Sequence, residues 1–177
     1  MIWYAKRKAV MALAVRNMVR CALFAALLTI SAWLSVNTGG MVFSLQSFAV
    51  FLALGTLGGK RGSICVAVYL LLGAVGLPVF TGFQGGFGAF FDLFAGYRWG
   101  FLLCALTYWI LENRLPDWVN MAVSMVVCYF CGVIWMATVW HTEPWAAIAV
   151  GVLPYLLPDA VKITLALLIR RRLKKIA

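Results

Sequence analysis

The chain contains 177 residues, of which 65% are hydrophobic, and it carries 15 Lys and Arg residues against 5 Asp and Glu residues. This balance excludes a soluble domain, and it excludes a nucleic-acid partner because the basic residues lie between apolar segments and not on one polar face. A spanning helix needs roughly 20 apolar residues, which leaves room for about six spans but none for a soluble ATPase domain. We therefore expect an all-α integral membrane protein in contact with lipid, with residues 1–177 forming a single transmembrane domain.

Six hydrophobic segments follow one another along the chain and are predicted to form transmembrane helices, at about residues 18–36, 45–58, 62–77, 95–112, 118–139 and 155–170. Most of the connections between them are short. The two longer ones are residues 77–94, which are rich in glycine, and residues 140–154. If the N-terminus is cytoplasmic, both longer connections lie on the outer side.

The basic residues support this orientation. Thirteen of them fall on one predicted side of the membrane: Lys6, Arg7, Lys8, Arg16, Arg20, Lys60, Arg61, Arg114, Arg170, Arg171, Arg172, Lys174 and Lys175. This positive-inside pattern predicts a multi-pass protein of a prokaryotic inner membrane with both termini cytoplasmic. The other two, Arg98 and Lys162, fall at membrane depth, where a costly ionisable side chain indicates a functional site. Arg98, beside Tyr97, could instead snorkel outward.

Asp159 and Lys162 are the strongest candidates for a binding site. Their spacing of three places both side chains on one helix face. Pro158 suits the first turn of a helix, so we expect the sixth span to open at Asp159. Pro154 and Pro158 then predict non-helical backbone at membrane depth, which is tolerated where it lines a cavity. The alternative is an ion pair that only fastens two helices.

The glycine-rich connection is a second candidate. Residues 76–88 include Phe80, Phe83 and Phe87, which suit a lid over an apolar or ring-shaped ligand, whereas many glycine-rich segments are simply flexible outer loops. Ser44 and Gln46, at the start of the second span, offer neutral hydrogen-bonding groups. Alone, these two residues are weak evidence for a binding site.

Ala22 and Ala26 form a small-xxx-small pair on the first predicted span. Small residues at this spacing let two helices approach closely. The pair therefore indicates either packing within the protein or an interface with a partner.

Several catalytic motifs are incomplete. Gly59-Lys60 lacks the preceding glycine and the following Ser or Thr of a phosphate-binding loop. Cys128 and Cys131 have redox-like spacing within an apolar span, where packing is the simpler explanation. His141 has no metal-ligand cluster near it in the sequence. We expect no enzyme activity, no metal and no cofactor.

A set of short motifs extends over about residues 20–170: Leu45-Gln46, Gly58-Gly59-Lys60-Arg61-Gly62, the run Tyr69–Phe80, the glycine-rich loop, Gly96-Tyr97, and Gly151-Val152-Leu153-Pro154-Tyr155 followed by Asp159 and Lys162. In these motifs, their order and their spacing, the chain resembles the BioY family, the biotin-binding S components of energy-coupling factor (ECF) transporters. This resemblance implies a six-helix S-component-like bundle that binds biotin near the outer face. It also implies docking on an energy-coupling transmembrane subunit and two ATPase subunits.

The resemblance also assigns residues to these roles. It implies that Ala22 and Ala26 contact the coupling subunit. The substrate contacts that we expect from the residues and the resemblance together are Ser44, Gln46, Gly85, Gly86, Tyr97, Arg98, Tyr155, Asp159 and Lys162. The chain departs from the family pattern at Asp92-Leu93-Phe94-Ala95-Gly96-Tyr97, where Gly-Pro-Thr-Gly-Gly-Tyr is common, and at Pro158, where Gly is usual.

Biotin has groups that suit these residues: a ureido ring that donates and accepts hydrogen bonds, a thiophane ring and a carboxylate. Asp159 then accepts from the ureido N–H groups or orients Lys162, and Lys162 compensates negative charge. The alternatives are an S component for another vitamin, a membrane-embedded redox protein that uses Cys128 and Cys131, and a structural membrane subunit without a ligand.

Overall fold

The computed structural model describes residues 2–38 and 41–176, and it is almost entirely helical. Its elements, in chain order, are α1 (Ile2–Trp33), β1 (Ser35–Thr38), β2 (Met41–Ser44), α2 (Gln46–Leu57), α3 (Gly59–Ala74), the short 3-10 helices η1 (Thr81–Phe83) and η2 (Phe87–Phe90), α4 (Ala95–Leu111), α5 (Asp117–Val139), α6 (Pro144–Gly151) and α7 (Leu153–Ile176). The predicted helical membrane bundle is confirmed, and the six predicted spans correspond to α1, α2, α3, α4, α5 and α7.

The helices differ in how much of a membrane they can cross. Within the described residues, three stretches are long and apolar enough to span it: Met11–Trp33, Asp117–Val139 and Pro144–Leu173. Helices α2, α3 and α4 have 12, 16 and 17 residues, which at about 1.5 Å per residue is less than the hydrocarbon thickness of about 30 Å. Helix α2 is nevertheless apolar and buried along most of its length, because it packs between α1, α3 and α7.

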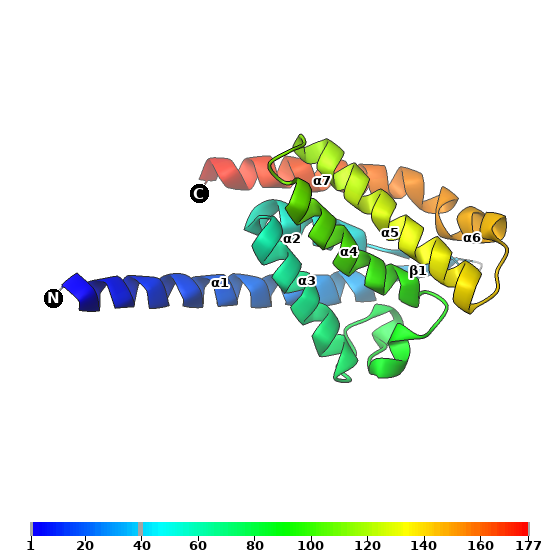
Figure 1. Cartoon of the computed structure of the whole chain (residues 1–177), viewed down its shortest axis with the longest axis horizontal. Coiled ribbons are helices and arrows are strands. Elements are labelled where there is room, and N and C mark those ends of the chain that lie inside the picture. Colours follow the sequence, from blue (N-terminus) through cyan, green and yellow to red (C-terminus); the bar gives the residue numbers. More distant parts are fainter. Residues whose placement is uncertain (1, 39–40, 177) are drawn as a thin grey trace.

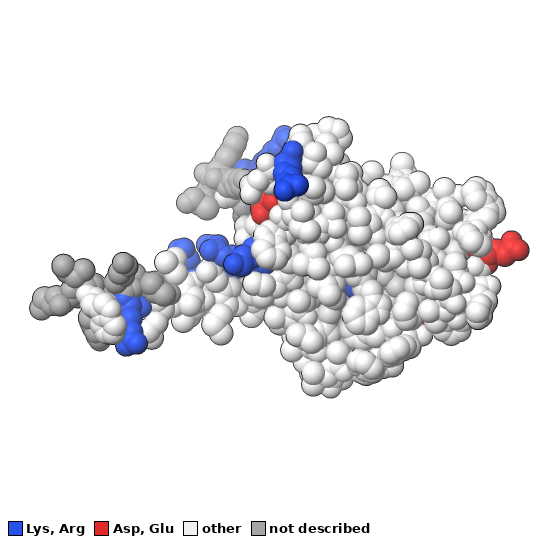
Figure 2. All heavy atoms as spheres, viewed as in Figure 1, with Lys and Arg blue, Asp and Glu red and all other residues white. Residues whose placement is uncertain are grey.

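Both described ends of the chain lie on the same side of the bundle, and α1 projects well beyond the other helices there (Figure 1). Figure 2 shows Lys and Arg side chains gathered over this end. The side chains of Lys6, Lys174 and Lys175 lie outside the described part of the structure. The β1–β2 hairpin and α6 lie at the opposite end (Figure 1).

Helices α4 and α5 pack closely because α4 presents two glycines one turn apart. A Cβ added at Gly96 would collide with the side chain of Trp135. At Gly100, an added Cβ would lie 2.9 Å from the carbonyl oxygen of Cys128 and 3.1 Å from its Cα. This Gly-xxx-Gly contact brings the two backbones together, and it places side chains of both helices around the same space.

The hairpin was not predicted. Its strands pair antiparallel, with Ser35 opposite Ser44 and Val36 opposite Phe43. Gly39 and Gly40, which belong to the predicted connection between the first two spans, lie outside the described residues. The hairpin connects the end of α1 to the buried start of α2, and its two strands pair with each other.

The prediction that Pro158 opens the last helix at Asp159 is wrong. Helix α7 begins at Leu153, and the break that separates it from α6 lies at Val152, whose φ is −125°. Pro154 is therefore the first-turn proline, where the missing N–H is not needed. Pro158 lies inside the helix, and the non-helical backbone expected between the two prolines is absent from these described residues.

Candidate substrate-binding site

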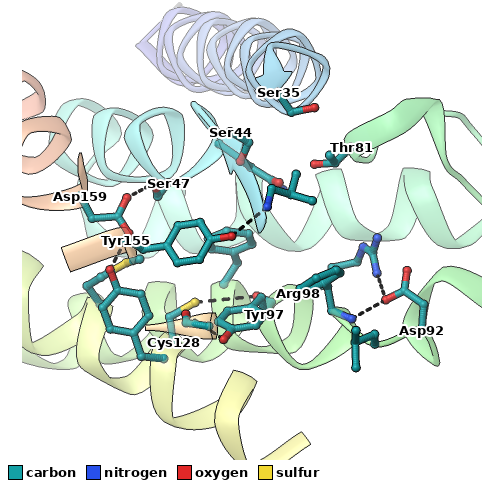
Figure 3. Close-up of a pocket in the computed structure, with 18 of the residues that line it drawn as sticks. Ser35, Ser44, Ser47, Thr81, Asp92, Tyr97, Arg98, Cys128, Tyr155 and Asp159 are labelled. Atoms are coloured by element: carbon teal, nitrogen blue, oxygen red, sulfur yellow. Dashed lines mark hydrogen bonds and ion pairs between the residues drawn. The ribbon is translucent and has the colours of Figure 1, made fainter. Parts of the chain in front are cut away.

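A cavity of about 500 Å³ lies among the hairpin, α2, α4, α5, α7 and the connection between α3 and α4. Seven of the nine predicted substrate contacts line it: Ser44, Gln46, Tyr97, Arg98, Tyr155, Asp159 and Lys162. Figure 3 shows Asp159 and Ser47 at one end of the cavity and Arg98 and Asp92 at the other, with Tyr155 and Tyr97 between them. We call the end with Asp159 and Ser47 the α2–α7 end, and the end with Arg98 and Asp92 the loop end.

The other two predicted contacts, Gly85 and Gly86, are not part of the cavity wall. The Gly86 N–H donates to the carbonyl oxygen of Gly73 at 2.7 Å, and Gly86 has a φ of +93°, which favours glycine. A Cβ added at Gly85 would collide with the Leu77 carbonyl. In this structure the two glycines fold the connection against the end of α3, and their contact with substrate remains a prediction.

Asp159 organises the α2–α7 end. Its side chain is 5% exposed, and its Oδ1 accepts from the Ser47 hydroxyl at 2.8 Å and from Lys162 Nζ at 2.9 Å. Its Oδ2 accepts from the Tyr129 hydroxyl at 2.5 Å. A carboxylate buried this deeply needs such donors, because an unpaired charge is expensive in a low-dielectric interior. The charge of Lys162 is thus compensated by Asp159.

Sequence reasoning missed Ser47 and Tyr129. They come from α2 and α5, far from Asp159 in the chain, and each resembles an ordinary residue of an apolar helix. The only signal available for Ser47 was its position next to Gln46. Gln46 itself donates through Nε2 to the Tyr69 hydroxyl at 3.0 Å, and this hydroxyl donates to the Val79 carbonyl at 2.9 Å.

Arg98 organises the loop end, and it is 8% exposed instead of snorkelling outward. Its Nη1 donates to the Ala89 carbonyl at 2.5 Å and to Asp92 Oδ1 at 2.7 Å, and its Nη2 donates to Gln84 Oε1 at 3.1 Å. Its guanidinium also lies 5.0 Å from the ring centroid of Phe80, within cation–π range. Arg98 therefore connects the first turn of α4 to the connection that covers the cavity.

Part of the connection that was predicted to form a lid borders the cavity. Thr81, Gly82 and Gln84 line the cavity, as do residues 92–94. The three phenylalanines proposed as cover lie elsewhere: Phe80 is buried, whereas Phe83 and Phe87 are exposed. None of the three is in the cavity wall.

Tyr155 and Tyr97 form much of the wall between the two ends. The Tyr155 hydroxyl accepts from the Val42 N–H of the hairpin at 2.9 Å, and its ring lies 5.0 Å from that of Phe43. The Tyr97 hydroxyl donates to the Gly151 carbonyl at 2.9 Å, next to the break between α6 and α7. Aromatic side chains thus give the cavity apolar faces with polar tips.

Cys128 and Cys131 are both free thiols, and Cys128 is buried in the cavity wall. Its thiol lies 3.8 Å from the carbonyl oxygen of Tyr97. Within the described residues, no group of three or more His, Cys, Asp or Glu side chains is placed to hold a metal ion. The polar groups of the cavity are suited to hydrogen bonding with a small organic ligand.

Comparisons with known proteins show what the chain is similar to. The model of the BioY family matches residues 5–177. The biotin transporter BioY of Thermotoga maritima is 37% identical over 165 residues, which cover 91% of this chain and 97% of the relative. The probable biotin transporter BioY of Pyrococcus horikoshii is 34% identical, over 86% of this chain and 93% of its own.

A solved structure also matches the fold. The crystal structure of the S-component for biotin from an ECF-type ABC transporter superimposes with a TM-score of 0.84 and 25% sequence identity, over 93% of each chain. The sequence match covers nearly the whole chain, and the structural match covers the bundle that surrounds the cavity. The chain belongs to the BioY family.

Proposed function

We propose that this chain captures biotin for uptake as the S component of an ECF transporter, working as a single transmembrane domain in a prokaryotic membrane. Its relatives are named as biotin transporters, and the matching crystal structure is that of an S-component for biotin. As a member of this family it is a transport component and not an enzyme. Biotin is its substrate and not a cofactor.

The observation that carries this proposal is the buried carboxylate of Asp159 in the wall of a cavity of about 500 Å³. A carboxylate oxygen accepts strongly from the N–H groups of a ureido ring. Tyr155 and Tyr97 supply the apolar faces for the rings. Displacing one of the present donors, such as the Ser47 hydroxyl, would free an acceptor position on Asp159 for the ligand.

The charge distribution supports an orientation in the membrane. Lys and Arg side chains gather toward the end of the bundle where α1 begins and α7 finishes (Figure 2). Lys and Arg are retained on the cytoplasmic side. This distribution therefore supports the proposal that both termini lie in the cytoplasm and that the hairpin and the cavity face the outside, where a ligand enters.

The first helix supports a docking surface for the coupling subunit. Ala22 and Ala26 are exposed, whereas Ala25 and Leu28 on the other face of α1 are buried in the bundle. The small-residue face is therefore available to a partner helix. We propose that it contacts the energy-coupling transmembrane subunit, which in turn carries two ATPase subunits.

A ligand panel tests the proposed substrate. Purified protein is heated with biotin or with other vitamins such as thiamine, riboflavin and folate, and the unfolding midpoint is measured. We expect biotin alone to raise the midpoint, because a ligand that binds only the folded state stabilises it. Stabilisation by a different vitamin would assign the cavity to that vitamin. Uptake of labelled biotin in a biotin-requiring cell, with and without the coupling subunits, tests the assembly.

Substitution of Ala22 and Ala26 by Leu should separate binding from transport. Two larger side chains on the exposed face of α1 would prevent close helix approach, so we expect biotin uptake with the coupling subunits to fall at least about 10-fold. Biotin affinity of the isolated protein should be retained because the cavity is remote from this face. Ala160→Leu, at an exposed position of α7, is the matched control. Equal uptake by the double variant and the control would contradict the assignment.

A further inference from the structure

The cavity wall contains four charged side chains, and they form two ion pairs: Asp159 with Lys162 at the α2–α7 end, and Asp92 with Arg98 at the loop end. The wall is therefore formally neutral. A ligand with a carboxylate meets no unpaired cation in this state. To form an ion pair with one of the two cations, it must compete with the protein carboxylate that already pairs with that cation.

The protein holds the Asp159 carboxylate more firmly than the Asp92 carboxylate. The Asp159 side chain is 5% exposed and accepts from three side-chain donors, Ser47, Tyr129 and Lys162. The Asp92 side chain is 33% exposed, and its Oδ1 accepts from Arg98 and from the Phe94 N–H at 2.9 Å. Water can solvate Asp92 once it leaves Arg98. It cannot do the same for Asp159 without opening the bundle.

The guanidinium of Arg98 is fixed by contacts other than Asp92. The Ala89 carbonyl, Gln84 Oε1 and the ring of Phe80 all hold it from the connection between α3 and α4. The backbone of Asp92 is also fixed, because its carbonyl accepts from Trp135 Nε1 at 2.9 Å. A rotation of the Asp92 side chain alone is therefore enough to uncover a preorganised cation at the loop end (Figure 3).

We propose that the Asp92 carboxylate takes the place of the substrate carboxylate in the ligand-free protein. It pairs with Arg98 there, and the carboxylate of the ligand displaces it on binding. This inference rests on the proposed function and adds an orientation to it. The uncharged ureido ring goes to the α2–α7 end, and the carboxylate goes to the loop end. Arg98 then selects the free acid against amides of the same ring system, because an amide cannot replace a carboxylate on a guanidinium without losing charge assistance.

The test compares biotin with biotinamide, which differs only at the carboxyl group, by calorimetry on the purified full chain. We expect the parent to bind biotin about 10-fold to 100-fold more tightly than biotinamide, the range of a charge-assisted hydrogen bond. Arg98→Gln should bring the ratio of the two dissociation constants close to one. Arg98→Lys should retain part of the preference. Asp92→Asn should increase the ratio of the biotinamide dissociation constant to the biotin dissociation constant, because the competing carboxylate is gone.

The ratio distinguishes recognition from a structural role. If Arg98 only fastens the connection, Arg98→Gln weakens both ligands equally and the ratio of the parent persists, which would overturn the inference. Equal affinity of the parent for biotin and biotinamide would overturn it as well, while leaving biotin capture intact. If Asp92→Asn lowers the ratio, Asp92 is not a competitor. Failure of the parent to bind either compound would reject the proposed function, and this inference with it.

Discussion

Replacement of Asp159 by Asn is expected to raise the dissociation constant for biotin by about 100-fold or more, the largest effect of any single substitution in the cavity. The carboxylate accepts from Ser47, Tyr129 and Lys162, and we propose that it also accepts from the ureido ring. An amide offers one oxygen acceptor where the carboxylate offers two. Titration calorimetry on purified protein measures the change.

The loss of charge has a second consequence. Asp159→Asn leaves the Lys162 ammonium, 12% exposed, without its counter-ion, and breaking a buried pair costs about 3–5 kcal/mol of stability. Combining Asp159→Asn with Lys162→Met removes both charges, so the unfolding midpoint should recover while biotin binding stays lost. Glu143→Gln, an exposed carboxylate at the start of α6, is the control. Parent-like affinity in Asp159→Asn would show that the α2–α7 end does not hold the ligand.

Introduction of a large side chain at Gly100 is expected to destabilise the protein strongly by forcing α4 away from α5. Leu at this position places atoms where α5 backbone now lies, since even a Cβ would be 2.9 Å from the Cys128 carbonyl oxygen. Backbone atoms cannot rotate away as a side chain can, so α4 and α5 must separate. We expect a loss of about 3 kcal/mol and a lower unfolding midpoint by about 10 °C.

Biotin binding should fall in the same variant, because Tyr97 and Arg98 on α4 share the cavity with Tyr129 on α5. Thermal unfolding in detergent measures the stability change. Gly88→Ala provides the comparison, since no described atom lies within 4 Å of an added Cβ there. An unchanged midpoint in Gly100→Leu would mean that α4 and α5 do not depend on this close approach.

The features that the sequence predicted correctly are those with strong local signals. Apolar length predicted the positions of the main helices, and the cost of burying an ionised group drew attention to Asp159, Lys162 and Arg98 before their surroundings were known. Their partners were not predictable, because Ser47 and Tyr129 reach Asp159 only through the packing of α2 and α5 against α7. Polarity alone does not distinguish a cavity residue from a packing residue.

The errors also have physical causes. Two prolines close together left the start of α7 ambiguous, and the helix begins at the earlier one because Pro158 is tolerated inside it. The hairpin strands have four residues each, too few for an alternating pattern to be visible. The role of Gly96 and Gly100 depends on which helix lies opposite, and a single sequence does not contain that information.

The length of α1 has a practical consequence for measuring the orientation of the protein in the membrane. Its 32 residues measure about 48 Å, against about 30 Å of hydrocarbon, so a rigid rod extends past the bilayer. Because this rod is one continuous helix with the part packed in the bundle, any tilt of the bundle is magnified at its far tip. A probe at that tip would report the orientation of the whole molecule in the membrane, while a probe near Tyr155 would report occupancy of the cavity.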